Sequence, residues 1–222
     1  MHIRRINWLK SFEHYDSGDY VQPQRQEAFH EWATTQLGVI CPKKIDYYKY
    51  RDRNHIKEIT GKYGDGWADS DNFAVHTVVP YDHHECVHLY TFLIGWPTQF
   101  FNEGIAVAFQ TDPYNNDFEA KWWSKPVHYW AKKFKNEGTL ISFDNILETD
   151  NFGSYDSSIT YPESGSFARF MIDNYGLDKM KSFFRVGNWK DSNAVIKQNF
   201  QSVYGFSINR AEEEWLKFLD NY

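Results

Sequence analysis

The segment His84-Glu85-Cys86-Val87-His88 decides how the rest of this sequence is interpreted, because it has the pattern H-E-x-x-H. On a helix, two histidines four residues apart project from the same face, one turn apart. Neutral imidazole nitrogens bind zinc at about 2.0–2.1 Å, and a neighbouring carboxylate can accept a proton from the water that the metal activates. The pattern therefore predicts His84 and His88 as zinc ligands and Glu85 as a general base. The alternative is a pair of partly buried helix histidines beside a solvated glutamate, which leaves the spacing unexplained.

The residues around this motif predict that it lies on a helix of about three turns. Asp82 is a favourable N-cap residue directly before the motif. The apolar run 89–94 continues the helix, and Gly95 with Pro97 ends it. We therefore expect His84 and His88 on the inner face of this helix.

A third zinc ligand is expected downstream, because a catalytic zinc ion normally has three protein ligands and one open position. The run 100–109 is almost wholly apolar and predicts a buried helix that carries one carboxylate, Glu103. A buried carboxylate without a partner is costly, and a metal ion would remove that cost. The alternative is an ion pair, but the nearest cationic residue downstream is Lys121.

These two segments resemble a known group of enzymes. The motif at 84–88, followed by Asn102-Glu103-Gly104-Ile105-Ala106, is similar to the gluzincin branch of the zincin metallopeptidases. Trp96-Pro97 leading into the second segment resembles the peptidase MA-like families in particular. The resemblance implies a Zn²⁺ ion held by His84, His88 and Glu103, with Glu85 as the general base.

The resemblance also implies an α+β, zincin-like metallopeptidase fold over a single domain, residues 1–222. It implies an N-terminal lobe, about 1–95, with a small mixed sheet and helices. A mainly helical C-terminal lobe, about 96–222, would follow, with the active site between the lobes. In such enzymes the last strand before the motif helix borders the cleft and pairs with extended substrates, which we extend to 73–79.

The helices and strands predicted along the chain agree with this division into two lobes. The patterns predict an irregular lead-in over 1–21, helices over 23–37 and about 52–59, strands over 44–50, near Trp67 and over 73–79, and a surface loop over 148–158. Further helices are expected over about 126–135, 142–147, 177–184, 192–200 and 208–219.

Tyr161 is a second candidate catalytic residue, because the helix expected to begin there resembles the one that follows the zinc site in these families. The matching tyrosine in the related zinc aminopeptidases donates a hydrogen bond to the oxyanion of the tetrahedral intermediate. Tyr155 is the other tyrosine in reach of that role, and a plain helix-capping role for Tyr161 remains open.

Composition excludes some classes of partner. The net charge is −6, and no basic run is longer than Arg4-Arg5 or Lys132-Lys133, so nucleic acid is not expected as a partner. Aromatic residues make up 19% of the chain. We favour a core filled with rings over an aromatic-lined groove for peptide or sugar.

No apolar run approaches the roughly 18 residues that a membrane span needs. Met1–Arg5 is positively charged, but no apolar core follows it as in a signal peptide. Of the two remaining interpretations, a cytoplasmic chain or one whose signal has been removed, we favour a secreted or periplasmic protein. Cys86 is expected to be a buried thiol, and a Cys41–Cys86 disulfide is the less favoured alternative.

The sequence therefore predicts a zinc-dependent peptidase with a peptide or protein substrate. The aminopeptidases similar to this chain bind the free amine with a Gly-x-Met-Glu-Asn strand, which does not occur here, so we favour an endopeptidase. The alternative is a non-catalytic zincin-like module that binds peptide or glycan and keeps a vestigial metal site. Glu85 argues against this alternative, since binding alone needs no general base.

Overall fold

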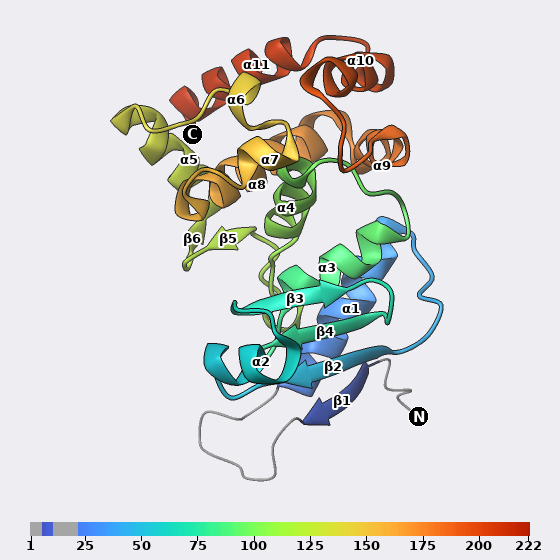
Figure 1. Ribbon diagram of the computed structural model, residues 1–222. Coiled ribbons are helices and arrows are strands. Elements are labelled where there is room, and N and C mark those ends of the chain that lie inside the picture. Colours follow the sequence, from blue (N-terminus) through green and yellow to red (C-terminus); the bar gives the residue numbers. More distant parts are fainter. Residues whose placement is uncertain (1–5, 11–21) are drawn as a thin grey trace. The chain divides into compact units, whose positions relative to one another are not determined.

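The computed structural model describes residues 6–10 and 22–222, which divide into two compact units. Unit 1 holds the described residues up to Leu93 together with Thr111–Phe118, and unit 2 holds Ile94–Gln110 and Glu119–Tyr222. Figure 1 shows strands and helices in the first and mainly helices in the second. The mixture confirms the predicted α+β class. None of the described helices combines the length and apolar character needed to cross a bilayer.

Unit 1 is built on a four-stranded sheet with the order β1-β2-β4-β3. Strands β1 and β2, and β2 and β4, pair in parallel, whereas β3 pairs antiparallel with β4. The elements are β1 (Ile6–Lys10), α1 (Pro23–Leu37), β2 (Ile45–Lys49), α2 (Arg53–Thr60), β3 (Gly66–Asp69), β4 (Ala74–Thr77), α3 (His83–Phe92) and the short 3-10 helix η1 (Pro113–Asn115).

The position of β4 in this sheet corrects the expectation that the strand before the motif helix offers a free edge. Strand β4 pairs with β2 through Tyr47↔Val75 and with β3 through Trp67↔His76, so both of its edges are occupied. The outer strand on this side is β3. An added strand could therefore pair with β3 and not with β4.

Two helices of unit 1 lie on the same side of this sheet. Helix α1 packs against α3, and α3 packs against β3 and β4 (Figure 1). Pro23 begins α1 at the first helical turn, and Gly38 ends it with a φ of +65°. Beneath these helices, Tyr47 and Val75 are fully buried. The motif helix α3 therefore packs directly on β3 and β4, the two strands that precede it in the sequence.

Unit 2 is organised around α8 (Ser157–Tyr175), which packs against four other helices. Its partners are α4 (Gln99–Ala108), α5 (Val127–Glu137), α9 (Leu177–Val186) and α11 (Ile208–Asn221). The remaining elements are the hairpin β5 (Lys121–Trp122) and β6 (Lys125–Pro126), α6 (Phe143–Ile146), α7 (Thr149–Phe152) and α10 (Asn193–Tyr204).

Two stretches differ from the sequence-based expectation. Strand β1, Ile6–Lys10, lies where an irregular lead-in is predicted, while residues 1–5 and 11–21 of that segment are outside the described residues. The predicted loop over 148–158 contains α7, and its Phe152 is only 1% exposed. Burying the Phe152 side chain is favourable, and this explains why a mostly polar stretch forms a helical turn that packs on the core.

The core of unit 2 is filled with aromatic rings, which confirms the preferred interpretation of the high aromatic content. Phe143 is the centre of one group, with ring centroids 5.0 Å from Phe100, 4.6 Å from Phe167 and 5.7 Å from Trp215. All four side chains are 1% exposed or less. The edge-to-face contacts with Phe100 and Phe167 and the stacked contact with Trp215 add to the stability gained by burying the rings.

Gly104 allows α4 to approach α8 closely. A Cβ atom at this position would lie 2.8 Å from the backbone oxygen of Ser164. We expect Gly104→Ala to lower the free energy of unfolding by about 1–3 kcal/mol through overpacking, measured by urea unfolding. The matched control is Gly153→Ala, because a Cβ there meets no atom closer than 3.6 Å. Equal stability of the two variants would contradict this account.

Candidate metal centre

The start of α3 is fixed by hydrogen bonds to Asp82. The Asp82 carboxylate accepts a hydrogen bond from the backbone N–H of Glu85 at 3.0 Å, which is the predicted N-cap. Its other oxygen accepts a hydrogen bond from the Thr77 hydroxyl of β4 at 2.7 Å. The motif helix is thereby tied to the strand before it.

Gln26 of α1 holds the same region from the other side. Its side-chain oxygen accepts a hydrogen bond from the backbone N–H of Asp82 at 2.8 Å, and its side-chain nitrogen donates to the Cys86 sulfur at 3.2 Å. Gln26 is fully buried, so both contacts are shielded from water. Nothing in the local sequence around Gln26 points to this role, because the contact spans some sixty residues of chain.

Cys86 is a fully buried thiol, as predicted, and it forms no disulfide with Cys41. Burial raises the pKa of the Cys86 thiol well above its usual value, because the thiolate would lose its hydration. Cys86 therefore serves the packing of α3 as a neutral side chain.

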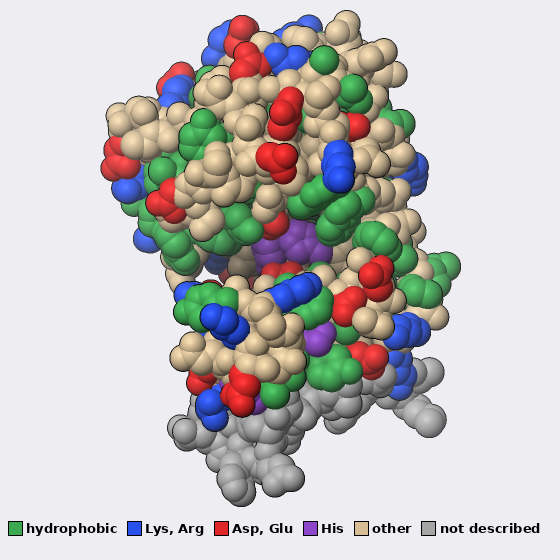
Figure 2. All heavy atoms as spheres, viewed as in Figure 1, with side chains coloured by type: hydrophobic (Ala, Val, Ile, Leu, Met, Phe, Trp, Pro, Cys, Tyr) green, Lys and Arg blue, Asp and Glu red, His purple; other side chains and the backbone are tan. Residues whose placement is uncertain are grey.

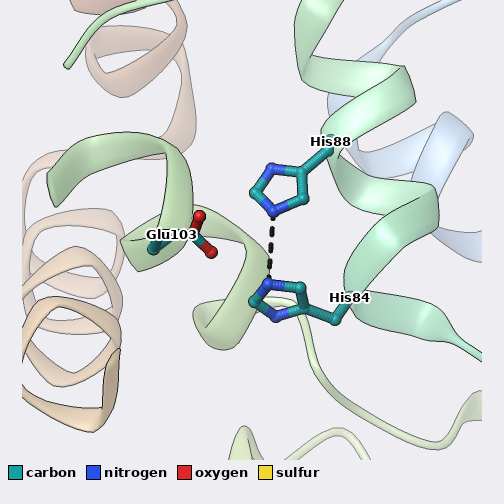
Figure 3. Close-up of side chains that lie close together, drawn as sticks. All are labelled: His84, His88 and Glu103. Atoms are coloured by element: carbon teal, nitrogen blue, oxygen red, sulfur yellow. Dashed lines mark hydrogen bonds between the residues drawn. The ribbon is translucent and has the colours of Figure 1, made fainter. Parts of the chain in front are cut away.

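His84 and His88 lie one turn apart on α3, with their Nε2 atoms 3.2 Å apart (Figure 3). Figure 3 marks this as a hydrogen bond between the two rings, in which the tautomers decide the donor. The distance between the two Nε2 atoms also matches that of two ligands on one metal ion. Two nitrogens that bind one tetrahedral ion at about 2.0–2.1 Å lie roughly 3.3–3.4 Å apart, so the rings already have the spacing of two ligands.

Glu103 lies on α4, where every residue from Phe100 to Ala108 is buried. The start of this helix is held by Asn102, whose side-chain nitrogen donates to the backbone oxygens of Pro97 and Thr98. Glu103 itself is 8% exposed. The lone carboxylate on this apolar helix is therefore held away from bulk water, as the sequence predicts.

The structure brings three of the predicted site residues together. His84, His88 and Glu103 each offer one ligand atom, and these atoms all lie within 4.8 Å of one another. Figure 3 shows the Glu103 carboxylate turned toward the two imidazole rings. Two nitrogen donors and one oxygen donor form a set that suits zinc. In the described part of the chain, no fourth histidine, cysteine, aspartate or glutamate joins this group.

His83, which directly precedes the motif histidines, does not belong to this cluster. Its Nδ1 lies 2.7 Å from the backbone oxygen of Thr111, and its ring stacks on Phe29 with centroids 4.0 Å apart. Burial lowers the pKa of His83 to about 4, because the cationic ring would be desolvated. His83 is therefore neutral at neutral pH, with Nδ1–H donating to the carbonyl, and it anchors α3.

Glu85 lies close to the backbone of β3. A Cβ atom added to Gly66 would be 3.1 Å from Cγ of Glu85 and 2.8 Å from an Asp82 oxygen. Only glycine lets the outer strand approach the motif helix this closely without displacing one of those carboxylates. Gly66 was not singled out from the sequence, because glycine in a turn-rich segment carries no sign of what will pack against it.

Tyr161 lies inside α8 and not at its beginning, which corrects the predicted helix start. The helix begins at Ser157, capped by Asp156, and includes Pro162 in its second turn. The Tyr161 ring is partly buried, 5.6 Å from the Trp122 ring and 5.9 Å from the Phe152 ring. The alternative, Tyr155, precedes the helix and is 40% exposed.

Figure 2 shows histidine side chains reaching the surface on the face that it draws. Acidic and basic side chains alternate over this face without forming a field of one sign.

A second buried acidic side chain, Glu163 of α8, is not part of the cluster formed by His84, His88 and Glu103. It is fully buried and accepts a hydrogen bond from the backbone N–H of Ile141 at 3.1 Å, while its other oxygen has no partner among the described residues. Burial raises its pKa to about 8, because the carboxylate would lose its hydration. Glu163 is therefore protonated in the folded protein at neutral pH.

This pKa predicts that the protein loses stability as the pH rises from about 4.5 to about 8. The folded state keeps the Glu163 proton until about pH 8, whereas the unfolded chain releases it near pH 4.5. The contribution is therefore complete below about pH 4.5 and is lost as the pH rises through about 8, by up to about 1.4 kcal/mol per pH unit. Glu163→Gln should remove this slope in urea unfolding, whereas the exposed control Glu137→Gln should keep it. Parallel pH profiles for Glu163→Gln and the parent protein would contradict the assignment.

Comparison of the chain with protein-family models, with curated proteins and with solved structures finds no match.

Proposed function

We propose that this protein is a zinc-dependent peptidase of the gluzincin type, with His84, His88 and Glu103 as metal ligands and Glu85 as general base. The observation that supports the proposal best is the gathering of three ligand atoms within 4.8 Å, two of them from an H-E-x-x-H helix. A helix histidine pair with a structural role would explain neither the buried carboxylate opposite nor the glutamate within the motif.

The number of donors favours a catalytic ion over a structural one. Structural zinc sites are normally closed by four protein ligands, whereas catalytic sites keep one position open for water or substrate. The described residues supply three donors to this cluster. When bound, zinc would supply Lewis acidity and lower the pKa of water toward about 7.

The protein's own residues would then move the proton. Glu85 accepts it from the attacking water and passes it to the amine of the leaving group, so that no covalent intermediate with the enzyme is needed. Tyr161 donates a hydrogen bond from its hydroxyl group to the developing oxyanion, a contact typically worth about 3 kcal/mol. The Asp82 cap keeps the Glu85 backbone fixed at the start of α3, which limits the reorganisation that proton transfer requires.

The substrate class that fits this site is an extended peptide. Strand β3 is one of the two outer strands of the sheet in the described chain and packs against the motif helix, so a substrate strand can pair with its outer edge near Glu85. An edge of this kind binds main-chain groups within a long chain. It therefore favours an endopeptidase, in agreement with the missing amine-binding strand of the aminopeptidases.

The experiment that tests the proposal is a casein digest by the zinc-loaded protein, analysed by mass spectrometry of the peptides released. We expect cleavage that stops on chelation and returns when zinc is restored. Equal inactivity of the parent protein and of Glu85→Gln, with zinc bound to both, would favour the metal-binding module over the enzyme.

A further inference from the structure

A second functional surface is suggested by the hairpin of unit 2. Strands β5 and β6 pair antiparallel with Trp122 opposite Lys125, which leaves Trp123 and Ser124 as a two-residue loop. Both loop residues have positive φ, +46° and +64°, the pattern of a type I′ turn. Such turns favour asparagine and glycine, so a tryptophan at the first position is held in a strained backbone.

The strained Trp123 side chain is 60% exposed, so this strain is not offset by burial in the core. Its ring lies 5.5 Å from the Trp130 ring, which contacts the Tyr129 ring at 5.4 Å. The indole N–H of Trp130 donates to the backbone oxygen of Trp122 at 2.6 Å and thereby fixes the group on the hairpin. We call Trp123, Tyr129 and Trp130 the hairpin patch.

The charge around the hairpin patch is opposite to that of the whole chain. Between residues 121 and 135 the sequence has five lysines and no acidic residue, although the chain carries a net charge of −6. Three of these lysines are paired, with Glu119, Glu137 and Asp220. Lys125 and Lys132 have no ion pair among the described residues, and the ammonium of Lys125 lies 5.7 Å from the Tyr129 ring.

We propose that the hairpin patch binds the surface of an anionic lipid bilayer. Tryptophan and tyrosine rings favour the region between lipid head groups and acyl chains, because one end of each ring system is apolar and the other is polar. Lysines beside them are attracted to anionic head groups, and the combination of an apolar and a basic signal gives reversible binding. A rigid turn presents Trp123 without the entropy cost of ordering a loop. This proposal is independent of the metal site.

The test is co-sedimentation of the whole chain with vesicles of phosphatidylcholine, with and without phosphatidylserine. We expect binding to the anionic vesicles that weakens at high salt. Trp123→Asn removes the ring and gives the turn a residue that it prefers, so this variant should melt at the same or a higher temperature than the parent protein. Its affinity for the anionic vesicles should nevertheless fall about tenfold or more.

Matched variants separate the contribution of the aromatic rings from that of the lysines. Lys125→Gln and Lys132→Gln should each weaken binding about fivefold. The controls Tyr63→Asn, at a side chain 63% exposed in unit 1, and Lys44→Gln should change nothing. The proposal is overturned if the parent protein does not sediment with anionic vesicles, or if Trp123→Asn binds them as tightly as the parent does. Retention on immobilised glycans that depends on Trp123, without vesicle binding, would assign the patch to carbohydrate instead.

Discussion

Glu85→Gln is expected to lower the rate of peptide hydrolysis by about 10²–10⁴-fold, the usual contribution of a general base. Glutamine keeps the size of the side chain and cannot accept the proton from water. It leaves His84, His88 and Glu103 in place, so zinc content should stay at one ion per chain. The measurement is kcat on a casein-derived peptide, together with zinc by mass spectrometry on the same sample.

A matched control for this variant is Glu58→Gln, the same change at an exposed position of α2. It should leave both the rate and the zinc content unaltered. If Glu85→Gln retained the parent rate, proton transfer would have to be assigned to another group. If it lost zinc as well as activity, Glu85 would be part of the metal site and its role as base would be unsupported.

Replacing His84 and His88 together by alanine is expected to abolish zinc binding, because only the Glu103 carboxylate of the cluster would remain. A ligand that binds only the folded state stabilises it by about 4 kcal/mol when present at a thousandfold its Kd. Zinc should therefore raise the unfolding free energy of the parent protein by an amount of this order and leave the double variant unchanged. Urea unfolding with and without zinc measures the difference without relying on activity.

His128→Gln provides the control for that experiment, since His128 is a histidine of unit 2 that contacts Ser166 and is not in the cluster. It should keep the full response to zinc. A response that survives in the double variant, or disappears in His128→Gln, would show that the ion binds elsewhere.

Features set by neighbouring residues could be predicted from the sequence. Helix α1 has the predicted bounds, because Pro23 favours the first helical turn and Gly38 takes the left-handed conformation that ends a helix. The two motif histidines share a face because helical periodicity alone places them there. Glu103 could be predicted as a ligand because it is the single carboxylate on an apolar helix, where an unpaired charge is costly.

Features set by distant residues could not be predicted. Pairing of β3 with the outer edge of β4 depends on contacts across the sheet, so the wrong strand was expected at the edge. The close approach of Gly66 to Glu85 and the contacts of Gln26 have the same origin. The start of α8 differs for a local reason: the resemblance implied a start at Tyr161, whereas the Asp156 cap sets the start four residues earlier, at Ser157.

The most direct test of the central claim is a crystal of the zinc-loaded protein measured at the zinc absorption edge. We predict one anomalous peak per chain, about 2.0–2.2 Å from Nε2 of His84, from Nε2 of His88 and from a carboxylate oxygen of Glu103. The absence of a peak at these three atoms, or a peak bound by other residues, would contradict the proposed metal site and with it the peptidase.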